Sequence, residues 1–158
     1  MPLEIERKFL VNSDKFKSEA FKSTRIVQGF LNTHPERTVR VRLFGEQGFL
    51  TIKGRTSENG LSRFEWETEI SIEEANALLD LCERGTIDKT RYEVEVGNHI
   101  YEVDVFSGEN KGLIVAEVEL ESESESFKKP KWLEKEVTGD LRYYNSNLSQ
   151  NPFKNWKS

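Results

Sequence analysis

The sequence has very little cysteine and histidine, and it contains no long apolar run. Its single cysteine, Cys82, excludes an internal disulfide framework and is compatible with a reducing compartment. The two histidines, His34 beside Pro35 and His99 in an expected turn, leave no basis for a zinc cluster or a Ser/His/Asp triad. No segment reaches membrane-spanning length, and the charged N-terminus lacks the apolar core of a signal peptide. We therefore expect a cytoplasmic protein that binds no membrane.

What the sequence has in abundance is charge of both signs. Of 158 residues, 28 are Asp or Glu and 23 are Lys or Arg, so the formal net charge is -5. This acidic balance gives no support for nucleic-acid binding. High charge with low apolar content can indicate disorder, but the 10 Phe, 4 Tyr and 3 Trp and the regular patterning argue for a folded chain. The length predicts one domain over residues 1–158.

Short segments with alternating apolar residues, separated by turn residues, predict a mostly antiparallel sheet. Gly45-Glu46-Gln47 and Gly97-Asn98-His99 each have the length of a hairpin connection. No long crossover helix separates the segments, so helices are expected only as appendages. The expected strands are Leu3–Val11, Ile26–Asn32, Thr38–Phe44, Gly48–Lys53, Leu61–Ser71, Thr86–Val96, Ile100–Phe106 and Gly112–Leu120.

Few segments have a helical pattern. Ser71-Ile72-Glu73-Glu74 is a capping box ahead of an apolar helical stretch. Shorter helices are expected over Asp14–Phe21 and at the C-terminus over Asp140–Ser149. Residues 121–126 alternate Ser and Glu and indicate a solvated connector, and residues 127–133 indicate a loop.

Each expected strand places charged side chains on one face and apolar side chains on the other. In Thr38–Phe44, for example, Arg40 and Arg42 share a face opposite Val41. A one-sided sheet with a solvated charged face is the simpler explanation for any one strand. Here, however, the polar positions are charged nearly throughout, and acids and bases segregate by strand. A sheet curled into a barrel with its charges inside would reconcile this composition with an ordered fold.

Such a lumen is expected to be wet and to bind a ligand, because buried charges without partners cost several kcal/mol per ion. Carboxylates without a supporting His/Cys cluster favour Mg²⁺ or Mn²⁺. Arginine and lysine side chains match phosphate oxygens, and several of them suit a ligand with several phosphates. Positioning and charge stabilisation of this kind are what phosphoryl transfer needs. The acidic candidates are Glu4, Glu6, Asp104, Glu117 and Glu119, and the basic candidates are Lys8, Arg40, Arg42, Lys53, Lys89 and Arg91.

Glu4-Ile5-Glu6-Arg7-Lys8 resembles the ExExK signature of the CYTH domain, in the triphosphate tunnel metalloenzyme superfamily. That signature is weak alone, but the ordered set of further matches covers nearly the whole chain and is specific. The chain most resembles the small, single-domain bacterial members. The further matches are Gln28-Gly29-Phe30-Leu31, Arg40-Val41-Arg42, Thr51-Ile52-Lys53, Glu65-Trp66-Glu67, Lys89-Thr90-Arg91-Tyr92, Glu102-Val103-Asp104-Val105-Phe106, Glu117-Val118-Glu119, Glu136-Val137-Thr138 and Arg142-Tyr143.

The resemblance implies an α+β fold: a closed eight-stranded antiparallel β-barrel, or tunnel, with a charged lumen and peripheral helices. It implies that the acidic candidates bind Mg²⁺ or Mn²⁺ and that the basic candidates bind triphosphate. It assigns catalysis to Glu6, Lys8 and Glu119, and it leaves open the role of the lumen acids Glu65 and Glu67. The C-terminal helix would close one mouth of the tunnel.

One residue departs from the pattern of the family. In tripolyphosphatases of the small bacterial kind, a tyrosine follows the Gln-Gly pair and is thought to help the lysine of the signature to activate water. Here that residue is Phe30, which has no hydroxyl. Either a bound cation lowers the pKa of water unaided, or the activity is slower or directed elsewhere. Tyr92 and Tyr101 cannot substitute, because both are expected on the apolar face.

Three functions remain open at this point. The leading hypothesis is a divalent-metal-dependent triphosphatase that acts on inorganic tripolyphosphate or a nucleoside triphosphate. The second is a class IV-type adenylate cyclase, in which the ribose 3′-hydroxyl is the nucleophile. The third is a noncatalytic polyphosphate- or nucleotide-binding module, for which Phe30 is the best support. The sequence does not define the oligomeric state, for which a homodimer is a candidate.

Overall fold

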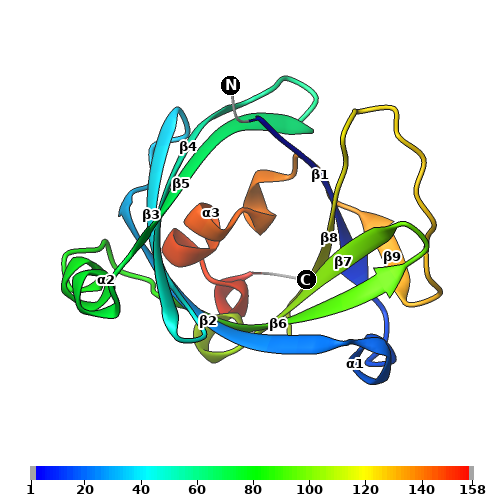
Figure 1. The fold of residues 1–158 in the computed structure, drawn as a ribbon, viewed down its shortest axis with the longest axis horizontal. Helices are drawn as coiled ribbons and strands as arrows, with labels where there is room; N and C mark the ends of the chain where they lie inside the picture. The colour runs from blue at the N-terminus through cyan, green and yellow to red at the C-terminus, as the bar shows by residue number, and fades with distance from the viewer. Residues whose placement is uncertain (1–2, 157–158) are drawn as a thin grey trace.

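A computed structural model, which describes residues 3–156, contains one antiparallel sheet of nine strands that closes into a barrel (Figure 1). The expected closed, eight-stranded barrel with peripheral helices is confirmed. Strand order is β5-β4-β3-β2-β6-β7-β8-β1-β9, and pairing of β5 with β1 closes the barrel. The strands are β1 (Leu3–Val11), β2 (Lys22–Asn32), β3 (Arg37–Phe44), β4 (Gln47–Thr56), β5 (Ser62–Ile70), β6 (Ile87–Val96), β7 (His99–Phe106), β8 (Ile114–Glu119) and β9 (Leu133–Glu136).

Two strands differ most from the sequence expectation, while every other strand except β1 has one or both ends shifted by one to three residues. Strand β2 begins at Lys22 and not at Ile26, because its first residues pair with β6, beginning with Lys22 opposite Glu93. Strand β9 has no counterpart among the expected strands, and only its first residue, Leu133, lies in the segment expected to be a loop. It has only four residues, so no alternating pattern could reveal it. Its pairing with β1 is reinforced by Arg7, which donates two hydrogen bonds of 2.9 Å to Glu136.

The main hydrophobic core lies outside the barrel wall and not in the lumen. Apolar side chains on the outer face, such as Phe9 and Val103, are covered by the short helix α1 (Phe16–Glu19) and by Trp132. Helix α1 is shorter than the expected Asp14–Phe21. This arrangement leaves the inner face of the strands free for charged residues.

Helix α2 (Ile72–Leu79) packs outside strands β2, β3 and β4 (Figure 1). The expected capping box is confirmed, because the Ser71 and Glu74 side chains each accept a hydrogen bond from the other's backbone N–H. Cys82 follows this helix and is half-buried. No helix within residues 3–156 is long and apolar enough to cross a bilayer.

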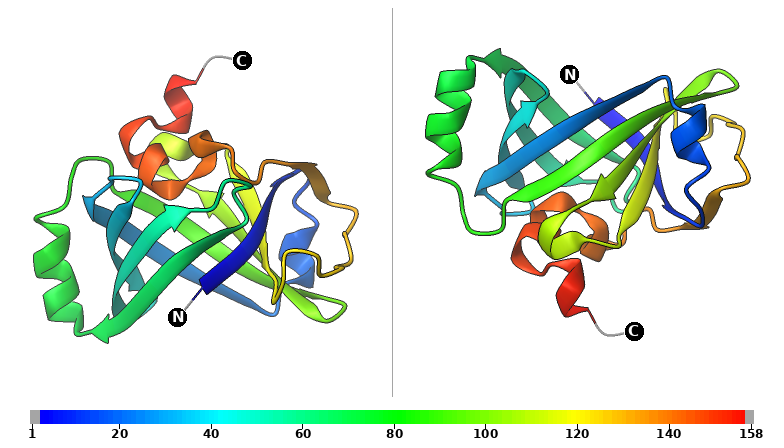
Figure 2. Two further views of the ribbon diagram at one scale, coloured as in Figure 1. Left: turned by 90° about the horizontal axis from the view of Figure 1, so that it is seen from above. Right: turned by 90° about the horizontal axis from the view of Figure 1, so that it is seen from below.

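The C-terminal residues lie across one end of the barrel (Figures 1 and 2). One helix was expected over Asp140–Ser149, but the structure has a 3-10 turn, η2 (Leu141–Tyr143), and then α3 (Asn145–Gln150). Tyr144 between them is extended, with φ -71° and ψ 133°, and interrupts the helix. We call residues 141–150 the plug segment. Two further 3-10 turns are η1 (Gly108–Asn110) and η3 (Phe153–Asn155).

The plug segment is seated tightly on the barrel. Leu148 is fully buried in a second hydrophobic cluster at this end, together with Phe30 and Tyr143. Gly85, with φ +95°, lies against α3, and a Cβ atom there would fall 1.7 Å from the carbonyl oxygen of Ser149. Only glycine allows this approach. The plug segment therefore closes one end of the tunnel.

Candidate active site in the tunnel

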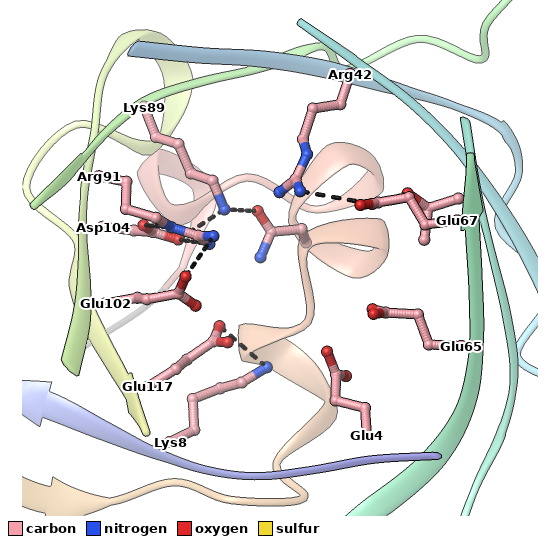
Figure 3. A network of polar contacts seen from close by, with 12 residues as sticks. Glu4, Lys8, Arg42, Glu65, Glu67, Lys89, Arg91, Glu102, Asp104 and Glu117 are labelled. Carbon is pink, nitrogen blue, oxygen red and sulfur yellow. Dashed lines mark hydrogen bonds and ion pairs between the residues drawn. The ribbon is translucent and has the colours of Figure 1, made fainter. Parts of the chain in front are cut away.

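Side chains from all eight strands of the barrel line one cavity of about 190 Å³. Figure 3 shows charged side chains from facing strands directed toward one another across this lumen. The charged faces that the alternation predicts therefore lie on the inner side of the barrel. The predicted site residues that line the cavity are Glu4, Glu6, Lys8, Arg40, Arg42, Lys53, Glu65, Glu67, Lys89, Arg91, Glu117 and Glu119.

The acidic part of the cavity is built by the neighbouring strands β1 and β8. Their antiparallel register puts Glu6 opposite Glu119 and Lys8 opposite Glu117. Burial, and then the nearby carboxylates of Glu117 and Glu4, raise the pKa of Glu6 well above its usual value. Burial would also raise the pKa of Glu117, but the charge of Lys8, hydrogen bonding with Glu6 and the charge of Arg91 together outweigh it and lower that pKa to about 2. Close carboxylates therefore repel one another in this part of the tunnel.

The basic part of the cavity is built mainly by β3. Arg40 and Arg42 approach the Glu67 carboxylate at 3.5 and 3.6 Å. Burial, and then the charges of Arg40 and Arg91, lower the pKa of Arg42 to about 9. The Nε atoms of Arg40 and Arg42 are buried without a hydrogen-bond partner among the described residues. Buried donors without acceptors are costly, so this cluster is suited to an anion with several oxygens.

The glutamates of β5 hold cations in place. Glu65 approaches Lys53 at 3.3 Å, and Lys53 also donates a hydrogen bond of 3.1 Å to Glu4 on β1. Glu67 accepts a hydrogen bond of 2.6 Å from Thr51 while it approaches the two arginines. Glu65 and Glu67 are therefore in direct contact with basic residues of the cavity.

Asp104 is the one predicted site residue that does not line the cavity. Arg91 donates to its two oxygens, Nε at 2.8 Å and Nη2 at 3.0 Å, and Lys89 Nζ lies 2.7 Å from Oδ2 (Figure 3). Burial would raise the pKa of Asp104, but the charges of Arg91 and Lys89 outweigh it and hold this pKa well below its usual value. Asp104 thus anchors two cations, and its role as a metal ligand stays a prediction.

Several lining residues received no role from the sequence, among them Glu102, Arg63, Tyr144 and Asn145. Glu102 approaches Arg91 at 3.3 Å, and Arg63 enters from β5. Both share the charged face of their strands, so the alternation could have identified them. Tyr144 and Asn145 come from the plug segment, and Asn145 Oδ1 accepts hydrogen bonds of 2.9 Å from Lys89 and from Gln28. No local pattern could reveal them, because their position depends on the chain folding back across the barrel.

The structure shows where Phe30 lies and where the tyrosines considered as its substitutes lie. Phe30 lines the closed end of the cavity and is buried. Tyr101 lies outside the wall in the main core, where its hydroxyl donates to the carbonyl of Lys128 at 2.6 Å. Tyr92 packs against Phe16, also outside. The exclusion of Tyr92 and Tyr101 from the lumen is confirmed.

The acidic residues suit a hard cation, although they do not form a ready-made cage. Within residues 3–156, no three Asp, Glu, His or Cys side chains converge closely enough to hold an ion. Glu4, Glu6, Glu117 and Glu119 nevertheless offer oxygens only, from two adjacent strands. Oxygen ligands are what Mg²⁺ and Mn²⁺ prefer. A divalent cation would also relieve the carboxylate repulsion that raises the pKa of Glu6.

A family model and several known proteins match this chain along nearly its whole length. The CYTH domain model covers residues 2–150. The chain is 49% identical over 158 residues to an inorganic triphosphatase of Acetivibrio thermocellus, with 99% of both chains covered. It is 37% identical over 150 residues to an inorganic triphosphatase of Nitrosomonas europaea, with 92% of this chain and 96% of that one covered. A crystal structure of an inorganic triphosphatase matches with a TM-score of 0.64 and 32% identity, covering 94% of this chain and 95% of that one. The sequence, the tunnel and these matches agree that the chain belongs to the CYTH domain family.

Proposed function

We propose that this protein is a divalent-metal-dependent triphosphatase that hydrolyses inorganic tripolyphosphate inside the tunnel. The observation that carries the proposal concerns Arg40 and Arg42, whose Nε atoms are buried and have no hydrogen-bond acceptor among the described residues. These two arginines line the same cavity as the carboxylates of β1 and β8. One half of the cavity suits a polyanion, and the other suits the cation that accompanies it. The two relatives named above, both inorganic triphosphatases, support the choice of substrate.

The metal would be held by glutamates from β1 and β8. The first candidates for its ligands are Glu4, Glu6, Glu117 and Glu119. Asp104 comes after them, because it would have to give up its contacts with Arg91 and Lys89 in order to bind a metal ion. When bound, Mg²⁺ or Mn²⁺ would neutralise phosphate charge and lower the pKa of water.

The basic residues would orient the triphosphate and stabilise the charge that develops during in-line attack of water on a terminal phosphorus. Little covalent chemistry is required of the protein, so placement of charge is its main contribution. We assign catalysis to Glu6, Lys8 and Glu119. The proposed triphosphate contacts are Lys8, Arg40, Arg42, Lys53, Lys89 and Arg91.

A substrate panel tests this proposal. Tripolyphosphate, ATP, GTP and thiamine triphosphate are each incubated with Mg²⁺ or Mn²⁺, and phosphate release is measured. We expect the highest kcat/KM with tripolyphosphate, complete loss of activity in EDTA, and recovery when either metal is restored. Cyclic AMP and pyrophosphate from ATP would instead identify an adenylate cyclase. Tight binding of tripolyphosphate without turnover under any divalent cation would identify a binding module.

Phe30→Tyr is expected to accelerate tripolyphosphate hydrolysis. The ring lies at the closed end of the cavity, so an added hydroxyl can take part in proton transfer near Lys8. Positioned proton transfer contributes typically 10²–10⁴-fold, and we expect roughly tenfold because packing against Tyr143 and Leu148 restricts the ring. Steady-state kcat is the measurement, with the melting temperature as a control for damage to the plug segment. An unchanged kcat in a stable variant would show that the missing hydroxyl does not limit the rate of tripolyphosphate hydrolysis.

Four further expectations stay predictions: a single domain over residues 1–158, a cytoplasmic location, a homodimer, and the absence of a nucleic-acid partner. Size-exclusion chromatography with light scattering would test the homodimer directly.

A further inference from the structure

Tyr144 of the plug segment faces the tunnel and contacts two of its cations. Lys8 Nζ lies 4.5 Å from the centroid of its ring, and Arg63 Cζ lies 5.8 Å from the same centroid. Both distances are within the range of cation–π attraction. Lys8 is on β1 and Arg63 is on β5, and these are the two strands whose pairing closes the barrel. The ring therefore bridges the seam of the barrel at its closed end.

Lys8 has few other contacts that could fix its ammonium group. Its nearest carboxylate oxygen is Glu117 Oε1, at 3.9 Å, which is beyond hydrogen-bonding distance. The residue itself is buried, with 8% of its surface exposed. A flexible four-carbon side chain in this position needs a contact that restricts it, and the Tyr144 ring supplies one.

Arg63 is a cation that has only neutral partners within hydrogen-bonding distance. Its Nε donates to the carbonyl of Gly54 at 3.1 Å, and its Nη2 donates to Thr38 Oγ1 at 3.3 Å. Within residues 3–156 it forms no ion pair. Burial lowers its pKa. Arg63 and Tyr144 also line a second cavity of about 470 Å³, which adjoins the tunnel beside the plug segment.

We propose that Lys8 and Arg63 form a phosphate-binding subsite at the closed end of the tunnel and that the ring of Tyr144 positions both cations. The ligand is one phosphoryl group of the triphosphate, so the inference rests on the proposed function and extends it to Arg63 and Tyr144, which no motif identifies. Since Lys8 lies over the face of the ring, the ring and not the hydroxyl does the positioning. Arg63 contacts the phosphoryl oxygens, and Tyr144 acts through the two cations.

The first test compares two substitutions of Tyr144. Tyr144→Leu removes the aromatic face, and we expect it to raise the KM for tripolyphosphate roughly three- to thirtyfold, the range of one cation–π contact, with a smaller change in kcat. Tyr144→Phe keeps the face and should recover most of that loss. A wild-type KM in Tyr144→Leu would overturn the proposal. Equal damage in both variants would also overturn it, because the hydroxyl would then be the active group.

Tyr92→Leu is the matched control. The Tyr92 ring packs against Phe16 outside the barrel, and Lys17 Nζ lies 5.8 Å from its centroid. The same substitution there should lower the melting temperature without raising the KM. A comparable rise in KM would mean that Tyr144→Leu reports general loosening of the fold, and this would count against the proposal.

A second test measures the coupling between Tyr144 and Arg63. Arg63→Gln should raise the KM alone, and adding Tyr144→Leu to it should raise the KM by less than the product of the two single effects. Independent, multiplicative effects would overturn the positioning role. Calorimetric titration of the same variants with tripolyphosphate reports affinity without turnover. The subsite can therefore be tested even if hydrolysis, and with it the proposed function, fails.

Discussion

Glu6→Gln should nearly abolish phosphate release from tripolyphosphate and, in the same protein, raise the melting temperature. The Glu6 carboxylate is one of the first candidate ligands of the metal ion, and an amide is a much poorer ligand for Mg²⁺ or Mn²⁺. We expect a loss of kcat on the order of 10²–10³-fold, comparable to removal of one strong electrostatic contact in an active site. Activity is measured with saturating Mg²⁺ and with saturating Mn²⁺.

The gain in stability follows from the surroundings of the same side chain. Burial, Glu117 and Glu4 all raise the pKa of Glu6, which means that its charged form is disfavoured in the folded protein. Replacing a poorly compensated charge with a neutral group of the same shape is commonly neutral or stabilising. We expect a gain of about 1–2 kcal/mol, or about 2–8 °C in melting temperature for a chain of this size. Thermal unfolding in EDTA isolates this effect from metal binding.

Glu134→Gln is the matched control for this variant. Glu134 is exposed on the edge strand β9, outside the tunnel. The same change there should alter neither kcat nor the melting temperature, since surface substitutions usually stay within about 0.5 kcal/mol. Glu119→Gln should reproduce the loss of kcat. If both Glu6→Gln and Glu119→Gln retained activity, the assignment of the catalytic metal to β1 and β8 would be wrong.

The inner face of the barrel was predictable because side-chain alternation is a local property of a strand. Arg40 and Arg42, for example, must share a face whatever the rest of the chain does. The sequence did not define which inner side chains reach the lumen. Asp104 lies directly opposite Arg91 on the neighbouring strand, and that register draws its carboxylate into a buried ion pair. Register between strands is set by the whole sheet, and strand-by-strand alternation does not report it.

The plug segment was only partly predictable for a related reason. A C-terminal helix was expected, but its break at Tyr144 was not. The consequence is functional, because the extended conformation of Tyr144 lets it contact Lys8 while Asn145 contacts Lys89. These contacts join residues far apart in the chain, so they follow from how the segment docks and not from helix propensity.

Asp104→Asn should have the opposite effect on stability to Glu6→Gln. The Asp104 and Lys89 side chains are only 3% and 2% exposed, and Asp104 is the shared anion for Lys89 and Arg91. Removing one partner of a buried ion pair leaves the others uncompensated and typically costs about 3–5 kcal/mol. The melting temperature should fall by about 6–20 °C. The KM for tripolyphosphate should rise as well, because two of its proposed contacts lose their anchor.

Asp88→Asn gives a matched control on the same strand as Arg91. Arg25 donates to Asp88 through two hydrogen bonds of 3.1 and 2.7 Å, but the two side chains are 70% and 38% exposed. Exposed pairs of this kind contribute about 0–1 kcal/mol, so this variant should unfold almost like the wild type. The comparison separates the two roles open to Asp104. A stable Asp104→Asn protein that loses activity and needs more Mg²⁺ would make Asp104 a metal ligand, whereas a destabilised protein with an unchanged metal requirement would make it the anchor of Arg91 and Lys89.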